Sequence, residues 1–180
     1  MIKVCFFKSV YLNFIVGYDH SKYWRRRDIV INPTSKVPKF VRLIYLLYLR
    51  RIDSKNGAEI ATGLGGGAKF KTAPILPHGL KGIVIHGSAS IGKNVTIHQQ
   101  VTIGTRHENK SATIGDDCII GAGAKILGNI IIGDRCKIGA NAVVIDNVPS
   151  NSTVVGVPGR IIRWRDNYED SSSSCQYESK

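Results

Sequence analysis

The stretch from residue 114 to residue 144, IGDDCIIGAGAKILGNIIIGDRCKIGANAVV, has an aliphatic residue at every sixth position. The same six-residue spacing extends upstream, with one break. Its members are Ile85, Ile91, Ile97, Ile103, Ile114, Ile120, Ile126, Ile132, Ile138 and Val144. This period fits neither an amphipathic helix nor an alternating strand, but it fits a short strand and a turn that repeat. Three hexads would form one turn of a triangular coil whose aliphatic residues point inward.

The composition agrees with a protein built from short strands. A chain of 180 residues with 43% hydrophobic composition is long enough for one globular domain with a sizeable core. Its 24 isoleucines and 19 glycines, against one methionine, favour strands and turns over a helical bundle. The four cysteines are scattered, which predicts neither a disulfide scaffold nor a zinc site. Cys118 and Cys136 lie one coil apart, so we expect them to stack as small core residues rather than form a redox pair.

The six-residue register breaks at two places. Three extra residues lie around Pro77–Gly82, and five lie between Gly104 and Thr113. Insertions in a solenoid leave its surface as loops, and functional groups are often carried on such loops. A weaker arm of the repeat, upstream of the first break, predicts that Leu64, Phe70 and Leu76 also point inward.

The positive charge is concentrated before the repeat. Residues 1–58 hold 12 of the 25 Lys and Arg residues but only three of the 13 Asp and Glu residues. We expect helix and loop over 1–34 and an amphipathic helix over 35–53, with Phe40, Leu43, Ile44 and Leu47 on one stripe. The favoured interpretation is that this stripe packs on the base of the coil while the charges are solvated. The alternative is a basic segment that docks on an acidic membrane surface or an anionic polymer.

Three regions are therefore expected. They are a basic helical segment over 1–58, a repeat domain over 59–162 and a polar, disordered tail over 163–180. Residues 160–164 read as a last strand or short helix. No apolar run is long enough to span a bilayer, and no cleavage site follows an apolar run, so a cytoplasmic location is expected, with the inner face of the membrane as the alternative.

Several motifs in order resemble one family. They are the run from Ile114 to Asn129, the ending Gly156-Val-Pro-Gly-Arg160, the pair His78-Gly79 before Gly82-Ile-Val-Ile85, and Val101-Thr-Ile-Gly104. Together they resemble the hexapeptide-repeat acyltransferases, and most closely the serine acetyltransferase group, over about residues 64–162. The resemblance implies a mainly β fold, a left-handed parallel β-helix, assembled as a homotrimer. It also implies acetyl-CoA as co-substrate in the groove between subunits, with no metal.

The resemblance also assigns roles to individual residues. His78 takes the place of the catalytic histidine, and Thr105, Ala122, Ala140 and Arg160 fall at or near positions that hold the coenzyme. Arg106, His107 and Gln99 are candidates for the acceptor site, although Arg106 and His107 fit an ordinary exposed loop equally well. An imidazole is a suitable base at neutral pH for removing a hydroxyl proton, so direct acetyl transfer is expected. For His98 a surface position is favoured over a place in the cleft.

Departures from the serine acetyltransferase pattern bear on the acceptor. Pro77 stands where that group has an acidic residue before its histidine, and Gly63 stands where it has a second one, with Glu59 the nearest carboxylate. The helical lead-in is also shorter. The expected acceptor is therefore a sugar hydroxyl in surface polysaccharide or glycan synthesis. The alternatives are serine O-acetylation for cysteine biosynthesis and a non-catalytic scaffold that docks on an acidic surface.

Overall fold

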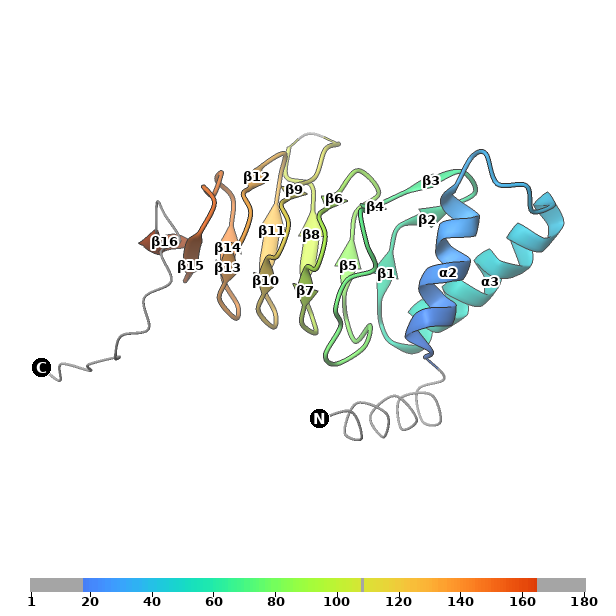
Figure 1. The fold of residues 1–180 in the computed structure, drawn as a ribbon. Coiled ribbons are helices and arrows are strands. Elements are labelled where there is room, and N and C mark those ends of the chain that lie inside the picture. The colour runs from blue at the N-terminus through green and yellow to red at the C-terminus, as the bar shows by residue number, and fades with distance from the viewer. Residues whose placement is uncertain (1–17, 108, 165–180) are drawn as a thin grey trace, which may run out of the picture.

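The computed structural model describes residues 18–107 and 109–164 and contains two helices followed by a stack of short parallel strands (Figure 1). The helices are α2 (His20–Ile31) and α3 (Lys39–Lys55). The first strands are β1 (Glu59–Ile60), β2 (Thr62–Gly63), β3 (Gly66–Gly67), β4 (Lys69–Phe70), β5 (Val84–Ile85), β6 (Ser90–Ile91), β7 (Thr96–Ile97) and β8 (Thr102–Gly104). The remaining strands are β9 (Thr113–Ile114), β10 (Ile119–Ile120), β11 (Lys125–Leu127), β12 (Ile131–Ile132), β13 (Lys137–Ile138), β14 (Val143–Val144), β15 (Ser152–Val155) and β16 (Arg160–Trp164).

The strands form the three faces of a β-helix. Face 1 has the order β1-β5-β8-β11-β14, face 2 has β4-β6-β9-β12, and face 3 has β7-β10-β13-β15-β16. The chain visits the faces in turn, so each strand pairs in parallel with strands one coil away; Ile120, for example, lies beside Ile97 and Ile138. Among the described strands of these three faces, β16 alone runs antiparallel, against β15; β2 and β3 form a separate antiparallel hairpin. The helices cap one end of this stack and β16 lies at the other (Figure 1). The fold is therefore the expected mainly β, parallel β-helix with a helical N-terminal segment.

The repeating aliphatic residues fill the centre of the β-helix, as predicted. All ten members of the period, from Ile85 to Val144, are buried in one continuous cluster. Cys118 and Cys136 belong to this cluster, and their thiols point at the carbonyl oxygens of Gly133 and Pro149, with both Sγ–O distances at 3.1 Å. The prediction that both cysteines are core residues is confirmed. Burying each isoleucine contributes roughly 1.5–3 kcal/mol, so the column is the main apolar stabilisation of the solenoid.

The first coil differs from the prediction. Leu64 does not point inward: its side chain is 51% exposed at the turn of the β2–β3 hairpin, and Ile60, only 3% exposed, fills the inward position. Ile60 pairs with Ile85 in the next coil. The reason is that the hairpin of residues 62–67 is inserted between two positions of the repeat, so that counting back in sixes from Phe70 lands on its tip.

The apolar stripe of α3 also lies elsewhere than expected. Phe40 is 67% exposed and Leu47 61% exposed, so the stripe faces away from the β-helix. The opposite side of α3 carries Leu46, Leu49 and Ile52, and these pack in a second core cluster against α2 and the first coil. Because α3 is apolar on two sides, periodicity alone did not decide which side is buried. None of the helices in the described parts of the chain meets the length and hydrophobicity needed to cross a membrane.

The charges of the N-terminal segment are not all solvated. Arg27, on α2, is completely buried. Its guanidinium donates hydrogen bonds to the carbonyl oxygens of Ala61 and Ala68, at 3.1 and 2.7 Å, and it stacks over Phe70 at 4.8 Å from the ring centroid. Arg27 therefore joins α2 to the first coil through Nη2, whereas its Nη1 is buried and meets no acceptor among the described residues.

Candidate active site

His78 lies at the corner where the chain passes from face 3 to face 1. It follows the bridge that pairs Ile75 with Thr96, and it lies on the three-residue insertion before β5. Its side chain is exposed. The loop is held to the coil above, because the Gln100 N–H donates to the Lys81 carbonyl oxygen at 2.9 Å. Gly82 in this loop has φ +63°, and a Cβ there would come within 3.2 Å of Gln100, so the close approach favours glycine.

Three of the residues singled out in the sequence stack above this loop. The N–H of Gly123 donates to the carbonyl oxygen of Gln99 at 2.9 Å, and the N–H of Asn141 donates to that of Ala122 at 2.8 Å. These bonds place Gln99, Ala122 and Ala140 at the same corner in successive coils. We call His78, Gln99, Ala122 and Ala140 the corner column. Gln99 Oε1 is buried and accepts no hydrogen bond from the described residues, so this corner holds an unpaired polar atom.

His98 belongs to the same corner, although its sequence position favoured a place on the surface. The ring centroids of His78 and His98 are 5.8 Å apart, and the ring planes are tilted by 43°. The two histidines lie close together because the Ile97 N–H donates to the Ile75 carbonyl oxygen. This bond places residue 98 one coil above the start of the His78 loop. The signal in the sequence was the position of His98 directly before Gln99, in the coil that follows the insertion.

Thr105, Arg106 and His107 lie at a different corner. They begin the five-residue insertion after β8, between face 1 and face 2, and Arg106 and His107 are exposed. The loop is anchored by Ser111, whose hydroxyl donates to the Gly104 carbonyl oxygen at 3.0 Å. Within one subunit, the structure therefore does not bring Arg106 or His107 to His78.

Arg160 lies near the far end of the corner column. It begins β16 and pairs with Val155, while the N–H of the preceding Gly159 donates to the Val143 carbonyl oxygen at 2.8 Å. A cleft of about 210 Å³ here is lined by Arg160 and Asp146, among others. Arg160 is exposed, so its guanidinium is available to an anionic group of a ligand.

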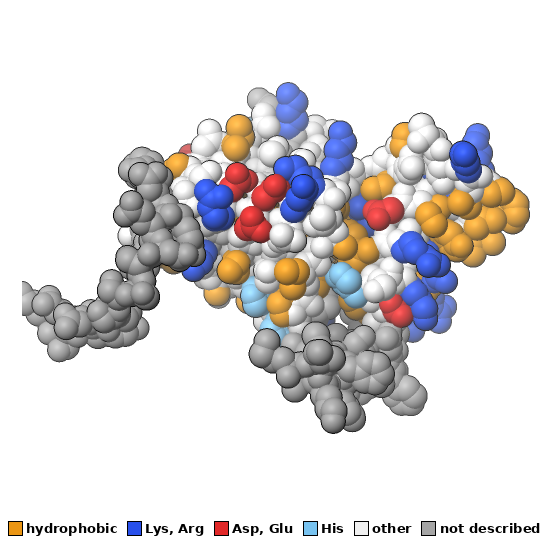
Figure 2. All heavy atoms as spheres, in the orientation of Figure 1, with side chains coloured by type: hydrophobic (Ala, Val, Ile, Leu, Met, Phe, Trp, Pro, Cys, Tyr) orange, Lys and Arg blue, Asp and Glu red, His pale blue; other side chains and the backbone are white. Residues whose placement is uncertain are grey.

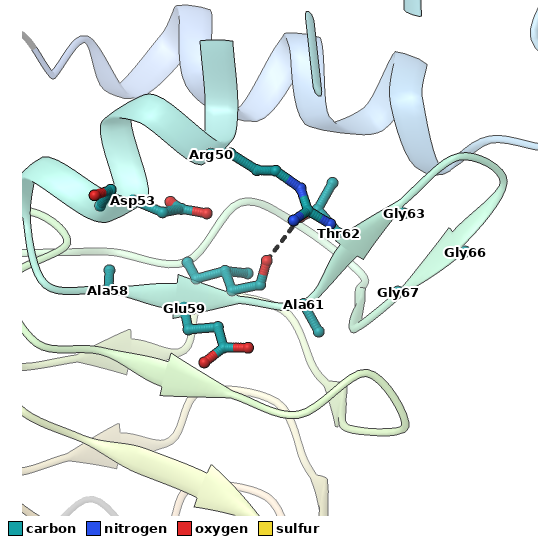
Figure 3. A pocket seen from close by; sticks show the side chains of 11 residues that line it. Arg50, Asp53, Ala58, Glu59, Ala61, Thr62, Gly63, Gly66 and Gly67 are labelled. Carbon is teal, nitrogen blue, oxygen red and sulfur yellow. Dashed lines mark hydrogen bonds between the residues drawn. The ribbon is translucent and has the colours of Figure 1, made fainter. Parts of the chain in front are cut away.

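A larger cleft, of about 630 Å³, lies between α3 and the first coil and does not include His78 among its lining residues (Figure 3). Arg50, Asp53 and Glu59 bring charges of both signs to it. Burial raises the pKa of Asp53 to about 6, although Tyr23 donates its hydroxyl to the carboxylate at 2.6 Å. The described residues include no group of three side chains arranged to hold a metal ion.

The two positions considered for an acidic residue, Gly63 and Glu59, have different surroundings. Gly63 pairs with Gly66 inside the β2–β3 hairpin, so no side chain stands there. Glu59 lies on face 1 beside Val84, and its N–H donates to the Ile83 carbonyl oxygen at 2.9 Å. Glu59 therefore lies at the start of β1, one coil below β5. The His78 loop leads into β5.

Comparison with known proteins agrees with this architecture. The pattern of the bacterial transferase hexapeptide family, which comprises six repeats, matches residues 111–146. A serine acetyltransferase of Staphylococcus epidermidis is 48% identical over 147 residues, covering 80% of this chain and 60% of the relative. The chain thus spans less than two thirds of the length of the curated relatives it matches.

Solved structures give the same result. Soybean serine acetyltransferase in complex with serine matches with a TM-score of 0.58 and 35% identity, over 67% of this chain and 49% of that one. A serine acetyltransferase in complex with CoA matches with a TM-score of 0.63 and 31% identity, over 83% of this chain and 57% of that one. With the six-residue period and the three-faced β-helix, these likenesses show that the chain carries, over residues 111–146, the repeat of the bacterial transferase hexapeptide family.

Proposed function

We propose that this protein is an acetyl-CoA-dependent O-acetyltransferase. The observation that carries the proposal is the corner column, in which the exposed His78 stands below Gln99, Ala122 and Ala140 on successive coils. Relatives named serine acetyltransferase, and the solved one in complex with CoA, support this activity. Acetyl-CoA would lie along the column, with Arg160 near its far end to pair with a phosphate.

In the proposed reaction the acetyl group moves directly from sulfur to oxygen. His78 accepts the acceptor's hydroxyl proton as that oxygen attacks the thioester carbonyl. A backbone N–H stabilises the negative charge that develops on the carbonyl oxygen. The carbon–sulfur bond then breaks, and the thiolate of CoA takes the proton from the imidazolium. The products are the O-acetyl ester and CoA, and no covalent enzyme intermediate is required.

A homotrimer would complete the site. Arg106 and His107 lie at another corner of their own subunit, so they can act on an acceptor bound at His78 only if that histidine belongs to a neighbouring subunit. Thr105, on the same loop, would then face coenzyme bound along the neighbour's corner column. The family resemblance supports this arrangement, and a closed ring of three triangular subunits brings unlike corners together.

Serine is the acceptor that the comparisons favour, because the relatives carry that name and the soybean enzyme is solved with serine. A sugar hydroxyl is the second candidate, and Pro77 and the glycine hairpin at Gly63 favour it. Both positions lack the carboxylate that would pair with the ammonium group of serine. Cytoplasm is the proposed location in either case, because the two described cysteines are unpaired thiols.

The experiment is a thiol-release assay with acetyl-CoA and, in separate reactions, serine and a panel of sugars and oligosaccharides. Acceptor-dependent CoA release supports the proposed activity, and the acceptor that is turned over decides between serine and sugar. No turnover with any acceptor would contradict the enzyme and leave the non-catalytic scaffold. Lys93→Ala serves as the control, because Lys93 is exposed at the corner between faces 2 and 3, away from both the corner column and the loop that carries Thr105, Arg106 and His107.

A further inference from the structure

The outer side of α3 carries an apolar patch at the end of the molecule opposite to β16. We call Phe40, Leu43, Ile44 and Leu47 the α3 patch; their side chains are 47–67% exposed. Figure 2 shows hydrophobic side chains gathered over α3, with Lys and Arg side chains beside them. Apolar residues scattered singly on a surface are ordinary, but a contiguous apolar stripe on one helix marks an interaction surface.

Positive charge flanks the patch at both ends. Lys36, which precedes α3, and Lys39, its first residue, are exposed, and Arg51 and Lys55 are exposed in its last turns. At 100° per residue, Arg51 and Lys55 continue the line of Phe40, Ile44 and Leu47.

The exposed side of α3 itself carries no negative charge. The only acidic residue of α3 is Asp53, and it is buried on the inner side against Tyr23. The exposed surface of the helix is therefore apolar in the middle and cationic at both ends.

This charge pattern discriminates between occupants. A second copy of the patch would bring the same cations together, so self-association through it is electrostatically disfavoured. The apolar segment of residues 1–17 has only Lys3 and Lys8 as charged residues, so it brings no negative charge either. Residues 165–180 include acidic residues but few apolar ones, and the strand that precedes them in the sequence, β16, lies at the opposite end of the molecule.

We propose that α3 docks this protein on an anionic lipid membrane. The apolar side chains of the α3 patch would enter the boundary between headgroups and acyl chains, and the flanking cations would lie among anionic headgroups, as in other interfacial amphipathic helices. The bound helix lies in the plane of the membrane and does not cross it. The proposal is independent of the acceptor, and it places the enzyme next to membrane-bound substrates if the acceptor is carried on a lipid.

The test is co-sedimentation of the full chain with vesicles of phosphatidylcholine alone and of phosphatidylcholine with about one third phosphatidylglycerol. The wild type is expected to bind the anionic vesicles at least about tenfold more strongly, and to release as salt is raised. Leu47→Glu should reduce this partition at least about tenfold, because it removes apolar burial and adds a negative charge. The double variant Arg51→Glu, Lys55→Glu should weaken both the binding and its salt dependence.

The matched control is Ile131→Glu, because Ile131 is 62% exposed on β12, away from α3, and should leave vesicle binding unchanged. Melting curves establish that each variant is folded. Equal binding of the wild type to neutral and anionic vesicles, or none to either, would overturn the proposal. So would a drop in the mass of Leu47→Glu by light scattering without a change in vesicle binding, because the patch would then join two copies of the chain.

Discussion

At the scale of single residues, replacing His78 is the most direct test of the proposed chemistry. Replacing His78 by Ala removes the proposed base and should lower kcat at least about 10²-fold, the lower end of what general-base catalysis contributes. The KM for acetyl-CoA should change little, because the coenzyme positions lie higher in the corner column. Steady-state kinetics of His78→Ala beside Lys93→Ala measures this; a near-normal kcat for His78→Ala would refute the assigned role.

Asp53 links burial to pH-dependent stability. Burial raises its pKa from an ordinary value of 3.8 to about 6 in the folded protein. Between about pH 4 and pH 6 the unfolded chain loses this proton while the folded protein keeps it, so the free energy of unfolding falls as pH rises through that window. Above it, the wild type carries a penalty on the order of 1–3 kcal/mol from this group.

The variant Asp53→Asn should remove that penalty and still accept the hydroxyl of Tyr23. We expect its stability relative to wild type to increase from pH 4 to pH 7, as measured by urea unfolding at each pH. Asp146→Asn, at an exposed position, should show no such trend relative to wild type. A stability difference for Asp53→Asn that stays constant across this pH range would contradict the raised pKa.

At the scale of elements, each short strand depends on one inward side chain. In β10, Ile120 is completely buried whereas its neighbour Ile119 is 41% exposed. Ile120→Ala should therefore cost about 2–5 kcal/mol of unfolding free energy through lost burial and an unfilled cavity. Ile119→Ala, with the same chemical change, should cost less than about 1 kcal/mol. Urea denaturation measures both losses of unfolding free energy. Similar losses would contradict the assignment of Ile120 to the inward position and Ile119 to the outward position of the strand.

The sequence predicts some of these elements and not others. The period located the inward residues from Ile85 to Val144, because every coil repeats the same environment. It misplaced Leu64, because the β2–β3 hairpin interrupts the period without changing the composition around it. It could not orient α3, because that helix is apolar on two sides and only packing against α2 and the first coil selects the buried one.

At the scale of the whole molecule, the separation of the two loop corners predicts complementation between subunits. His78→Ala and His107→Ala variants should each be impaired if His107 acts on an acceptor at the neighbour's His78. Refolding them together should restore activity, because about a quarter of the interfaces in randomly mixed trimers would carry both histidines. Activity of the mixture equal to the mean of the separate variants would show that His107 does not act across an interface.

The six-residue period was enough to predict the β-helix, the inward column and the two loops that break it, since it is a local property that every coil repeats. The sequence also singled out His78, Gln99, Ala122 and Ala140, although as a resemblance and not as an arrangement. The stacking of the coils is what brings these four residues to one corner, adds His98 to them, and leaves Arg106 and His107 at another. Coil register and the hairpin insertion set those neighbours, and both depend on contacts between residues far apart in the chain.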